Sequence, residues 1–235
     1  MRETLYLVPG LLCDATIWEP QIAALDDDYD IRVPDLTGHS SLSAMAAAIL
    51  ATAPDMISVA GHSMGARVAL EMVRQAPAHI RRLALLDTGV HPRTAGEAEK
   101  RQALLDLSAR EGMRALAERW LPPMVLPKNF IARQTLRAAL FAMVERMSPE
   151  IHRAQITALL DRPDAAPLLA EISCPVLVGV GDGDAWSPPE RHRAIADAIR
   201  DAVYVVFPHS GHMAPLEAPE AVTCALTDWM ALPTR

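Results

Sequence analysis

The sequence of 235 residues predicts an α/β fold with a mostly parallel sheet of about six strands and helices on both faces. Three observations favour this class. Six short runs rich in Val, Ile and Leu are nearly continuous in apolar residues, as strands covered on both faces are. Helical patterns separate most of these runs, which indicates right-handed crossovers in a doubly wound sheet. One long interval, between the fourth and fifth runs, has helical patterns only.

The expected elements follow one another in a regular order. The strands occupy residues 4–8, 31–35, 56–60, 83–86, 176–180 and 203–207. The helices outside the long interval occupy residues 43–52, 66–75, 189–199 and 219–230. Each strand run has four or five residues, the usual length of a buried strand, and Gly or Pro borders several of them.

The long interval has the pattern of amphipathic helices. Apolar residues recur at helical spacing at Met113, Leu116, Ala117 and Trp120, and again at Leu136, Leu140, Met143, Val144 and Met147. We therefore expect a core domain formed by residues 1–92 and 166–235, and a helical cap insert at residues 93–165. The insert would lie over the C-terminal edge of the sheet. Most of its apolar side chains would pack inside the protein, and a few would form the roof of a pocket.

The composition limits the classes of binding partner and the cellular compartment that we expect. The net charge of −7 disfavours nucleic acids and anionic membranes as partners. No apolar run reaches 18 residues, so no membrane span is expected, and the apolar stretch at the start is too short for a signal peptide. The three cysteines are scattered without metal-ligand spacing, which is typical of a reduced cytoplasm. We expect a cytoplasmic protein with no cofactor and no metal; its oligomeric state is not readable.

One motif carries a chemical signal. Residues 61–65 read Gly-His-Ser-Met-Gly, directly after an expected strand and directly before an expected helix. In that context Gly-x-Ser-x-Gly forms a nucleophile elbow, with the serine exposed at a sharp turn. Gly61 and Gly65 would leave room for crossing backbone, and the helix N-terminus would face negative charge at Ser63. The alternative interpretation is a structural turn with an idle serine.

A nucleophilic serine needs a base, and the base needs an orienting acid. Two histidines, His209 and His212, follow the sixth expected strand. Three aspartates follow neighbouring strands: Asp87 the fourth, and Asp182 and Asp184 the fifth. All of them would lie at the C-terminal edge of a parallel sheet, where such folds place their sites. Position alone leaves the pairing open.

The motifs together resemble the α/β-hydrolase superfamily, in particular small cap-bearing carboxylesterases such as the pimeloyl-carrier-protein methyl esterases. The matching segments are residues 7–12, 33–39, 61–65, 179–184 and 210–212. They correspond to the oxyanion loop, an Asp-x-x-Gly-His segment, the elbow, the acid loop and the histidine loop. The family pattern favours Asp184 over Asp182 and Asp87, and His212 over His209. It also implies that His62 points away from the site.

The resemblance carries further expectations. The first strand would lie at the centre of the sheet, between the second strand and the elbow strand. The N-terminal antiparallel hairpin usual in the family is expected to be missing. The backbone N–H groups of Leu11 and Met64 would form the oxyanion hole. Residues that could line the pocket are Cys13, Trp18, Trp120, Trp186 and Met213, although core packing explains each of them equally well.

The expected function is a serine hydrolase that cleaves a small ester or thioester through an acyl-enzyme intermediate, with Ser63, His212 and Asp184 as the catalytic triad. Acyl transfer, C–C bond hydrolysis and peptide release with the same triad stay open, and a non-catalytic ligand-binding protein is a further alternative. Seven insert arginines are candidates to meet an acidic carrier or a carboxylate, although a solvated helix face also explains them: Arg110, Arg114, Arg119, Arg133, Arg137, Arg146 and Arg153.

Overall fold

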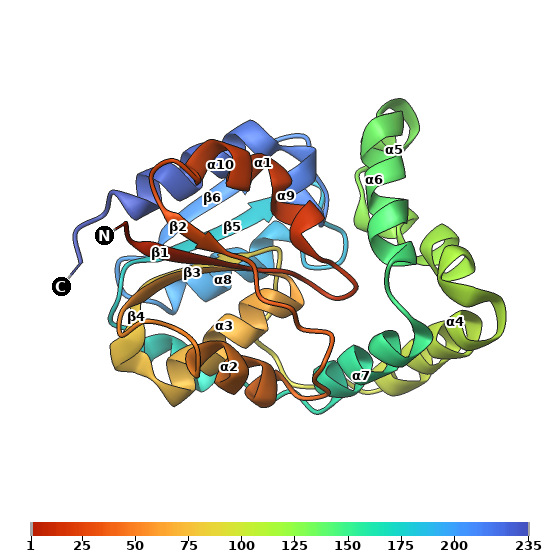
Figure 1. Cartoon of the computed structure of the whole chain (residues 1–235), viewed down its shortest axis with the longest axis horizontal. Coiled ribbons are helices and arrows are strands. Elements are labelled where there is room, and N and C mark those ends of the chain that lie inside the picture. Colours follow the sequence, from red (N-terminus) through yellow and green to blue (C-terminus); the bar gives the residue numbers. More distant parts are fainter. Residues whose placement is uncertain (1, 235) are drawn as a thin grey trace.

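In a computed structural model, residues 2–234 fold around one six-stranded sheet (Figure 1). All neighbouring strands are parallel, in the order β2-β1-β3-β4-β5-β6. The strands are β1 (Thr4–Val8), β2 (Asp30–Arg32), β3 (Ile57–His62), β4 (Ile80–Leu86), β5 (Val176–Gly181) and β6 (Val203–Phe207). The predicted α/β fold is confirmed, and β1 lies between β2 and β3 as expected.

Helices cover the sheet on both faces (Figure 1). On one face lie α1 (Glu19–Leu25) and α10 (Pro219–Met230), which contact each other. On the other lie α2 (Leu42–Leu50), α3 (Met64–Gln75) and α8 (Pro189–Asp197). The chain runs from β1 to β2 in one direction and from β3 to β6 in the other, so right-handed crossovers place α1 and α3 on opposite faces. The reversal lies beside β1 and β3, where a doubly wound sheet opens a crevice at its carboxyl edge.

The two outer strands differ from the expectation. β1, β3 and β5 are buried along their whole length, but Val203 and Val206 of β6 are each 40% exposed. An edge strand has a neighbour on one side only, so the expectation of full burial is wrong for β6. β2 ends at Arg32 rather than at residue 35, because Pro34 cannot donate a ladder hydrogen bond.

Only helices connect β4 to β5. They are α4 (Glu97–Trp120), α5 (Pro127–Ala132), α6 (Gln134–Glu145) and α7 (Pro149–Leu160), and they stand beside the core in Figure 1. The apolar residues that predicted two amphipathic helices are all buried. α4 loses helical conformation at Gly112, whose φ is 84°. We keep residues 93–165 as a proposed cap insert on a core of residues 1–92 and 166–235. No helix among residues 2–234 is long and apolar enough to cross a bilayer.

Candidate active site

The turn after β3 has the geometry of a nucleophile elbow. Ser63 joins β3 to α3 with φ 54° and ψ −113°, a strained conformation for a residue with a side chain. A Cβ atom on Gly61 would collide with the backbone of Ala66, and one on Gly65 would collide with the carbonyl of Val8. Glycine is therefore required on both sides of Ser63, for the reason that the motif predicted.

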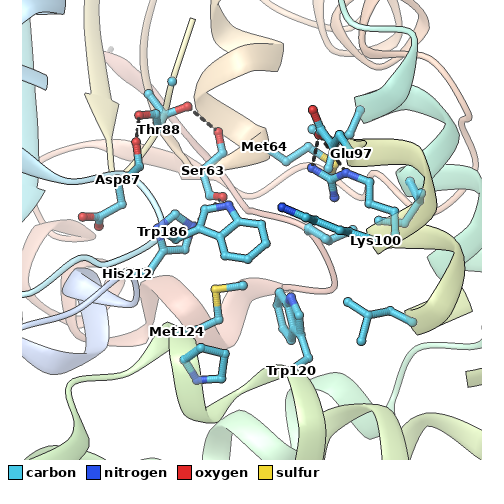
Figure 2. Close-up of a pocket in the computed structure, with 18 of the residues that line it drawn as sticks. Ser63, Met64, Asp87, Thr88, Glu97, Lys100, Trp120, Met124, Trp186 and His212 are labelled. Atoms are coloured by element: carbon cyan, nitrogen blue, oxygen red, sulfur yellow. Dashed lines mark hydrogen bonds and ion pairs between the residues drawn. The ribbon is translucent and has the colours of Figure 1, made fainter. Parts of the chain in front are cut away.

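Three side chains from different loops form a hydrogen-bonded chain at the carboxyl edge of the sheet. The Nε2 atom of His212 lies 2.8 Å from Ser63 Oγ, and its Nδ1 atom lies 2.8 Å from Asp184 Oδ2. The tautomer with hydrogen on Nδ1 satisfies both contacts, since Nδ1–H donates to the carboxylate and Nε2 accepts from the hydroxyl. The structure thus brings together Ser63, Asp184 and His212, the residues that the sequence singled out. Figure 2 shows Ser63 next to His212.

The surroundings of Asp184 keep it ionised. Its Oδ1 atom accepts hydrogen bonds from the N–H groups of Trp186 (2.8 Å) and Ser187 (2.9 Å), while Oδ2 faces His212. Burial opposes the charged form, but the charge and hydrogen bond of His212 and the two N–H donors outweigh burial and lower the pKa of Asp184. A charged acid at this position can stabilise a protonated imidazole.

The alternative residues lie elsewhere. Asp182 accepts hydrogen bonds from the N–H groups of His209 and Ser210, so it shapes the histidine loop. His209 lies at the surface, where its Nδ1 is 3.1 Å from Lys128 Nζ. Neither residue lines the cavity that contains Ser63.

Asp87 is the nearer alternative, and its environment differs from that of Asp184. It is fully buried; Oδ1 accepts a hydrogen bond of 2.9 Å from the N–H of Gly181, and Oδ2 lies 4.0 Å from His62 Nε2. Burial and the negative charge of Asp184 raise the pKa of Asp87 well above its ordinary value. The protonated form of Asp87 is therefore favoured.

The expectation that His62 points away from the site is wrong. Its ring is buried 5.5 Å from the ring of His212, and its Nε2–H donates a hydrogen bond of 2.7 Å to the His212 carbonyl. Burial and the positive charge of His212 lower the pKa of His62 to about 3, so His62 is neutral at ordinary pH. His62 thus holds the backbone of the histidine loop through this hydrogen bond.

Two backbone N–H groups of the cavity lining were expected to form an oxyanion hole. Leu11 and Met64 both line the cavity, and their N–H groups donate to no acceptor within residues 2–234. The next residue, Leu12, has a φ of 58° and donates its N–H to Gln155 Oε1 at 2.9 Å. Gln155 belongs to α7, so a helix of the insert fixes the loop that presents Leu11.

Two further contacts connect the insert to the histidine loop. The N–H of His212 donates to the carbonyl of Met124 at 2.8 Å. The buried Glu217 accepts from the N–H of Gly211 with one oxygen and from the N–H of Leu126 and the amide of Asn129 with the other. Burial raises the pKa of Glu217, although these donors oppose the shift. The sequence analysis missed Gln155 and Glu217, because neither belongs to a motif.

A cavity of about 1010 Å³ opens beside Ser63. Figure 2 shows Ser63 and His212 on one side of this space, Trp120 and Met124 below it, and Glu97 and Lys100 on the opposite wall. Of the expected pocket residues, Cys13, Trp120, Trp186 and Met213 line the cavity, whereas Trp18 is fully buried in the core. Among the described residues, no group of three or more His, Cys, Asp or Glu side chains could hold a metal ion.

Comparison with known proteins shows that the chain is similar to hydrolases. A family model described as the alpha/beta hydrolase family matches residues 5–225. The (E)-2-((N-methylformamido)methylene)succinate hydrolase of Acinetobacter baylyi is 28% identical over 243 residues, which cover 97% of this chain and 90% of the relative. The pimeloyl-[acyl-carrier protein] methyl ester esterase of Aromatoleum aromaticum is 27% identical over 246 residues, covering 97% and 98%.

A solved structure gives the same picture. A thermophilic esterase from Thermogutta terrifontis, with malate bound, is similar with a TM-score of 0.87 and 30% sequence identity. The similarity covers 97% of this chain and 89% of the esterase. These three relatives are hydrolases or esterases by name, and each is matched over nearly its whole length.

Proposed function

The chain belongs to the α/β-hydrolase family, and from this premise we propose that it is a serine hydrolase acting on a small ester or thioester. The observation that carries the proposal is the chain of hydrogen bonds from Ser63 through His212 to Asp184, on the wall of a cavity. Related proteins named as esterases support the ester as the bond that is cleaved.

The proposed reaction has two halves. His212 Nε2 takes the proton of Ser63 Oγ as this oxygen attacks the carbonyl carbon of the substrate. The N–H groups of Leu11 and Met64 stabilise the resulting oxyanion, each by about 3 kcal/mol. The intermediate collapses when His212 protonates the leaving group. Water, activated by the same imidazole, then releases the acid from Ser63.

The related proteins carry different substrates in their names, a methyl ester in one and a methylenesuccinate derivative in another. The residues that line the rest of the cavity, many of them from the insert, therefore decide the substrate, and the triad alone does not. The same triad also serves acyl transfer, C–C bond hydrolysis and peptide release. No observation at the site favours one of these over ester hydrolysis.

The test replaces the nucleophile and compares it with an exposed serine. Ser63→Ala should abolish hydrolysis of p-nitrophenyl butyrate and labelling by a fluorophosphonate, whereas Ser43→Ala on the surface of α2 should retain both. Circular dichroism establishes that both variants are folded. Labelling or turnover that persists in Ser63→Ala would overturn the assignment of Ser63. A wild-type protein that takes no label would favour a non-catalytic binding protein.

A further inference from the structure

The cavity carries a concentration of positive charge outside the triad. Four cationic side chains line it: Arg67 from α3, Lys100 and Arg101 from α4, and Arg162 after α7. Glu97 is the one carboxylate of the described residues that pairs with members of this group. We call these five residues the cationic wall.

The charge of Glu97 is already shared by two guanidinium groups. Arg162 binds both of its oxygens, with Nη1 2.8 Å from Oε1 and Nη2 2.7 Å from Oε2. The Nε atom of Arg101 donates to Oε1 at 2.9 Å. The remaining donors of Arg162 reach the carbonyls of His91, Pro92 and Leu159. Arg162 and Arg101 are thus held in place, and no carboxylate is left for Arg67.

Arg67, like Lys100, forms no ion pair within residues 2–234, whereas Arg101 and Arg162 both pair with Glu97. Within residues 2–234 it makes a single hydrogen bond, from Nη1 to the carbonyl of His91 at 3.1 Å. Its other guanidinium N–H groups have no acceptor in the described chain, and the side chain lines the cavity. Burial and the positive charges of Arg162 and Arg101 lower the pKa of Arg67 to about 9, although the negative charge of Glu97 opposes the shift.

The remaining charged groups of the cavity do not neutralise this wall. Arg119 and Arg191 add two cations, Glu118 contacts Arg114 outside the cavity lining, and the protonated form of Asp87 is favoured. The balance over the lining is therefore positive, although the whole chain carries −7. Arg67 is partly buried, so its guanidinium has lost part of its hydration, and an anionic ligand would replace that loss.

We propose that Arg67 binds a carboxylate of the substrate, so that the substrate is an ester that carries a second, free carboxylate, such as a monoester of a small dicarboxylic acid. This inference rests on the proposed ester hydrolysis at Ser63. Ser63 directly precedes α3 and Arg67 lies in the first turn of that helix, and both line the cavity. A guanidinium matches a carboxylate with two parallel hydrogen bonds, which also orients the ester carbonyl relative to Ser63.

The first experiment measures selectivity with matched esters. Monomethyl adipate and methyl hexanoate have the same chain length and differ in the free carboxylate; monomethyl succinate, glutarate and pimelate vary the length. Wild-type protein should show a kcat/KM at least about tenfold higher for the preferred monoacid ester than for its neutral match. Arg67→Gln should reduce that ratio to near one, mainly through KM. Arg67→Lys, which keeps the charge but not the fork, should retain part of it.

The matched control is Arg110→Gln. Arg110 lies on α4, outside the cavity lining, and its recorded contact is an exposed pair with Glu111 at 3.7 Å. The selectivity ratio of this variant should equal that of wild type. A wild-type protein without preference for any monoacid ester would overturn the proposal, as would an Arg67→Gln variant that keeps the full ratio.

A binding experiment separates this inference from the proposed reaction. Calorimetry titrates wild type and Arg67→Gln with the dicarboxylates from succinate to pimelate, and with adipamide as the neutral control. We expect wild type to bind at least one dicarboxylate and Arg67→Gln to bind it at least about tenfold more weakly. Dependence on Arg67 without turnover of any ester would refute the hydrolase and support the carboxylate site. Ester turnover without dicarboxylate binding would support the proposed hydrolase and refute the carboxylate site.

Discussion

Two buried aspartates follow neighbouring strands, and replacing each by asparagine separates their roles. Asp184, after β5, contacts His212 Nδ1 at 2.8 Å. Asp87, after β4, directs its oxygens at the backbone of Gly181 and at His62. Asparagine has nearly the size of aspartate, so both substitutions keep the packing. We expect Asp184→Asn to lose almost all activity and Asp87→Asn to keep it.

The contacts of Asp184 set the expected magnitude. Its Oδ1 atom is fixed by the N–H groups of Trp186 and Ser187 and must stay an acceptor. The amide NH₂ of an asparagine would therefore face His212 and force the imidazole proton onto Nε2. A protonated Nε2 cannot accept a hydrogen bond from the hydroxyl of Ser63. The same change in a well-studied Ser-His-Asp protease lowers kcat about 10⁴-fold, which corresponds to about 5.4 kcal/mol.

Asp87 should behave as a neutral group. Its raised pKa favours the protonated acid, for which asparagine is close in shape and charge, so activity should change by less than about threefold. The unfolded chain ionises this side chain above about pH 4 while the folded chain resists ionisation. Stability contributed by protonated Asp87 is therefore lost as pH rises, and Asp87→Asn should raise Tm relative to wild type more at pH 8 than at pH 5.

The assay is hydrolysis of p-nitrophenyl butyrate at pH 7.5, with fluorophosphonate labelling to count active sites and thermal scans at both pH values. The reasoning fails if Asp184→Asn retains more than about a tenth of the wild-type rate. It also fails if Asp87→Asn loses as much activity as Asp184→Asn, since Asp87 would then be the acid that orients His212.

Two further predictions concern stability and the oxyanion loop. Burial lowers the pKa of His152 and of His192 to about 4, so below pH 6.5 the unfolded chain binds protons that the folded chain refuses. Each histidine should remove about 2 kcal/mol of unfolding free energy between pH 7.5 and pH 5, measurable by urea denaturation; a flat profile would contradict this. Gln155→Leu should leave the Leu12 N–H buried without an acceptor and cost about 1–3 kcal/mol of stability. The same variant should lower kcat more than it changes KM. An unchanged kcat would show that the loop that presents Leu11 does not contribute to catalysis.

The sequence predicted the elements whose signals are local. Ser63 stands between glycines in a strand–turn–helix context, and Asp184 and His212 each follow a strand of a parallel sheet. Such positions converge at one edge of the sheet regardless of the rest of the chain. The sequence analysis did not identify helix α7 individually, although a local signal was present. Ser148 caps its N-terminus and Pro149 occupies its first turn.

Local sequence signals do not identify residues whose partners lie far away along the chain. Nothing in the sequence pairs Gln155 with Leu12, because 143 residues separate them. The charge pattern of the insert directed attention to exposed arginines such as Arg114, which pairs with surface glutamates. The cavity cations Arg101 and Arg162 lie on the inner side instead. Arg67 did carry a usable signal, because it lies four residues after Ser63, in the first turn of the helix that follows the elbow.

We therefore expect the insert to influence the rate as well as the choice of substrate. The carbonyl of Met124 holds the N–H of His212, and Gln155 holds the loop that presents Leu11. Both contacts come from the segment that also supplies most of the cavity wall. A displacement of about 1 Å between reacting groups can reduce a rate 100-fold. Substitutions that move these helices should therefore displace His212 and the oxyanion loop together with the cavity wall. Such variants should change substrate preference and kcat at the same time.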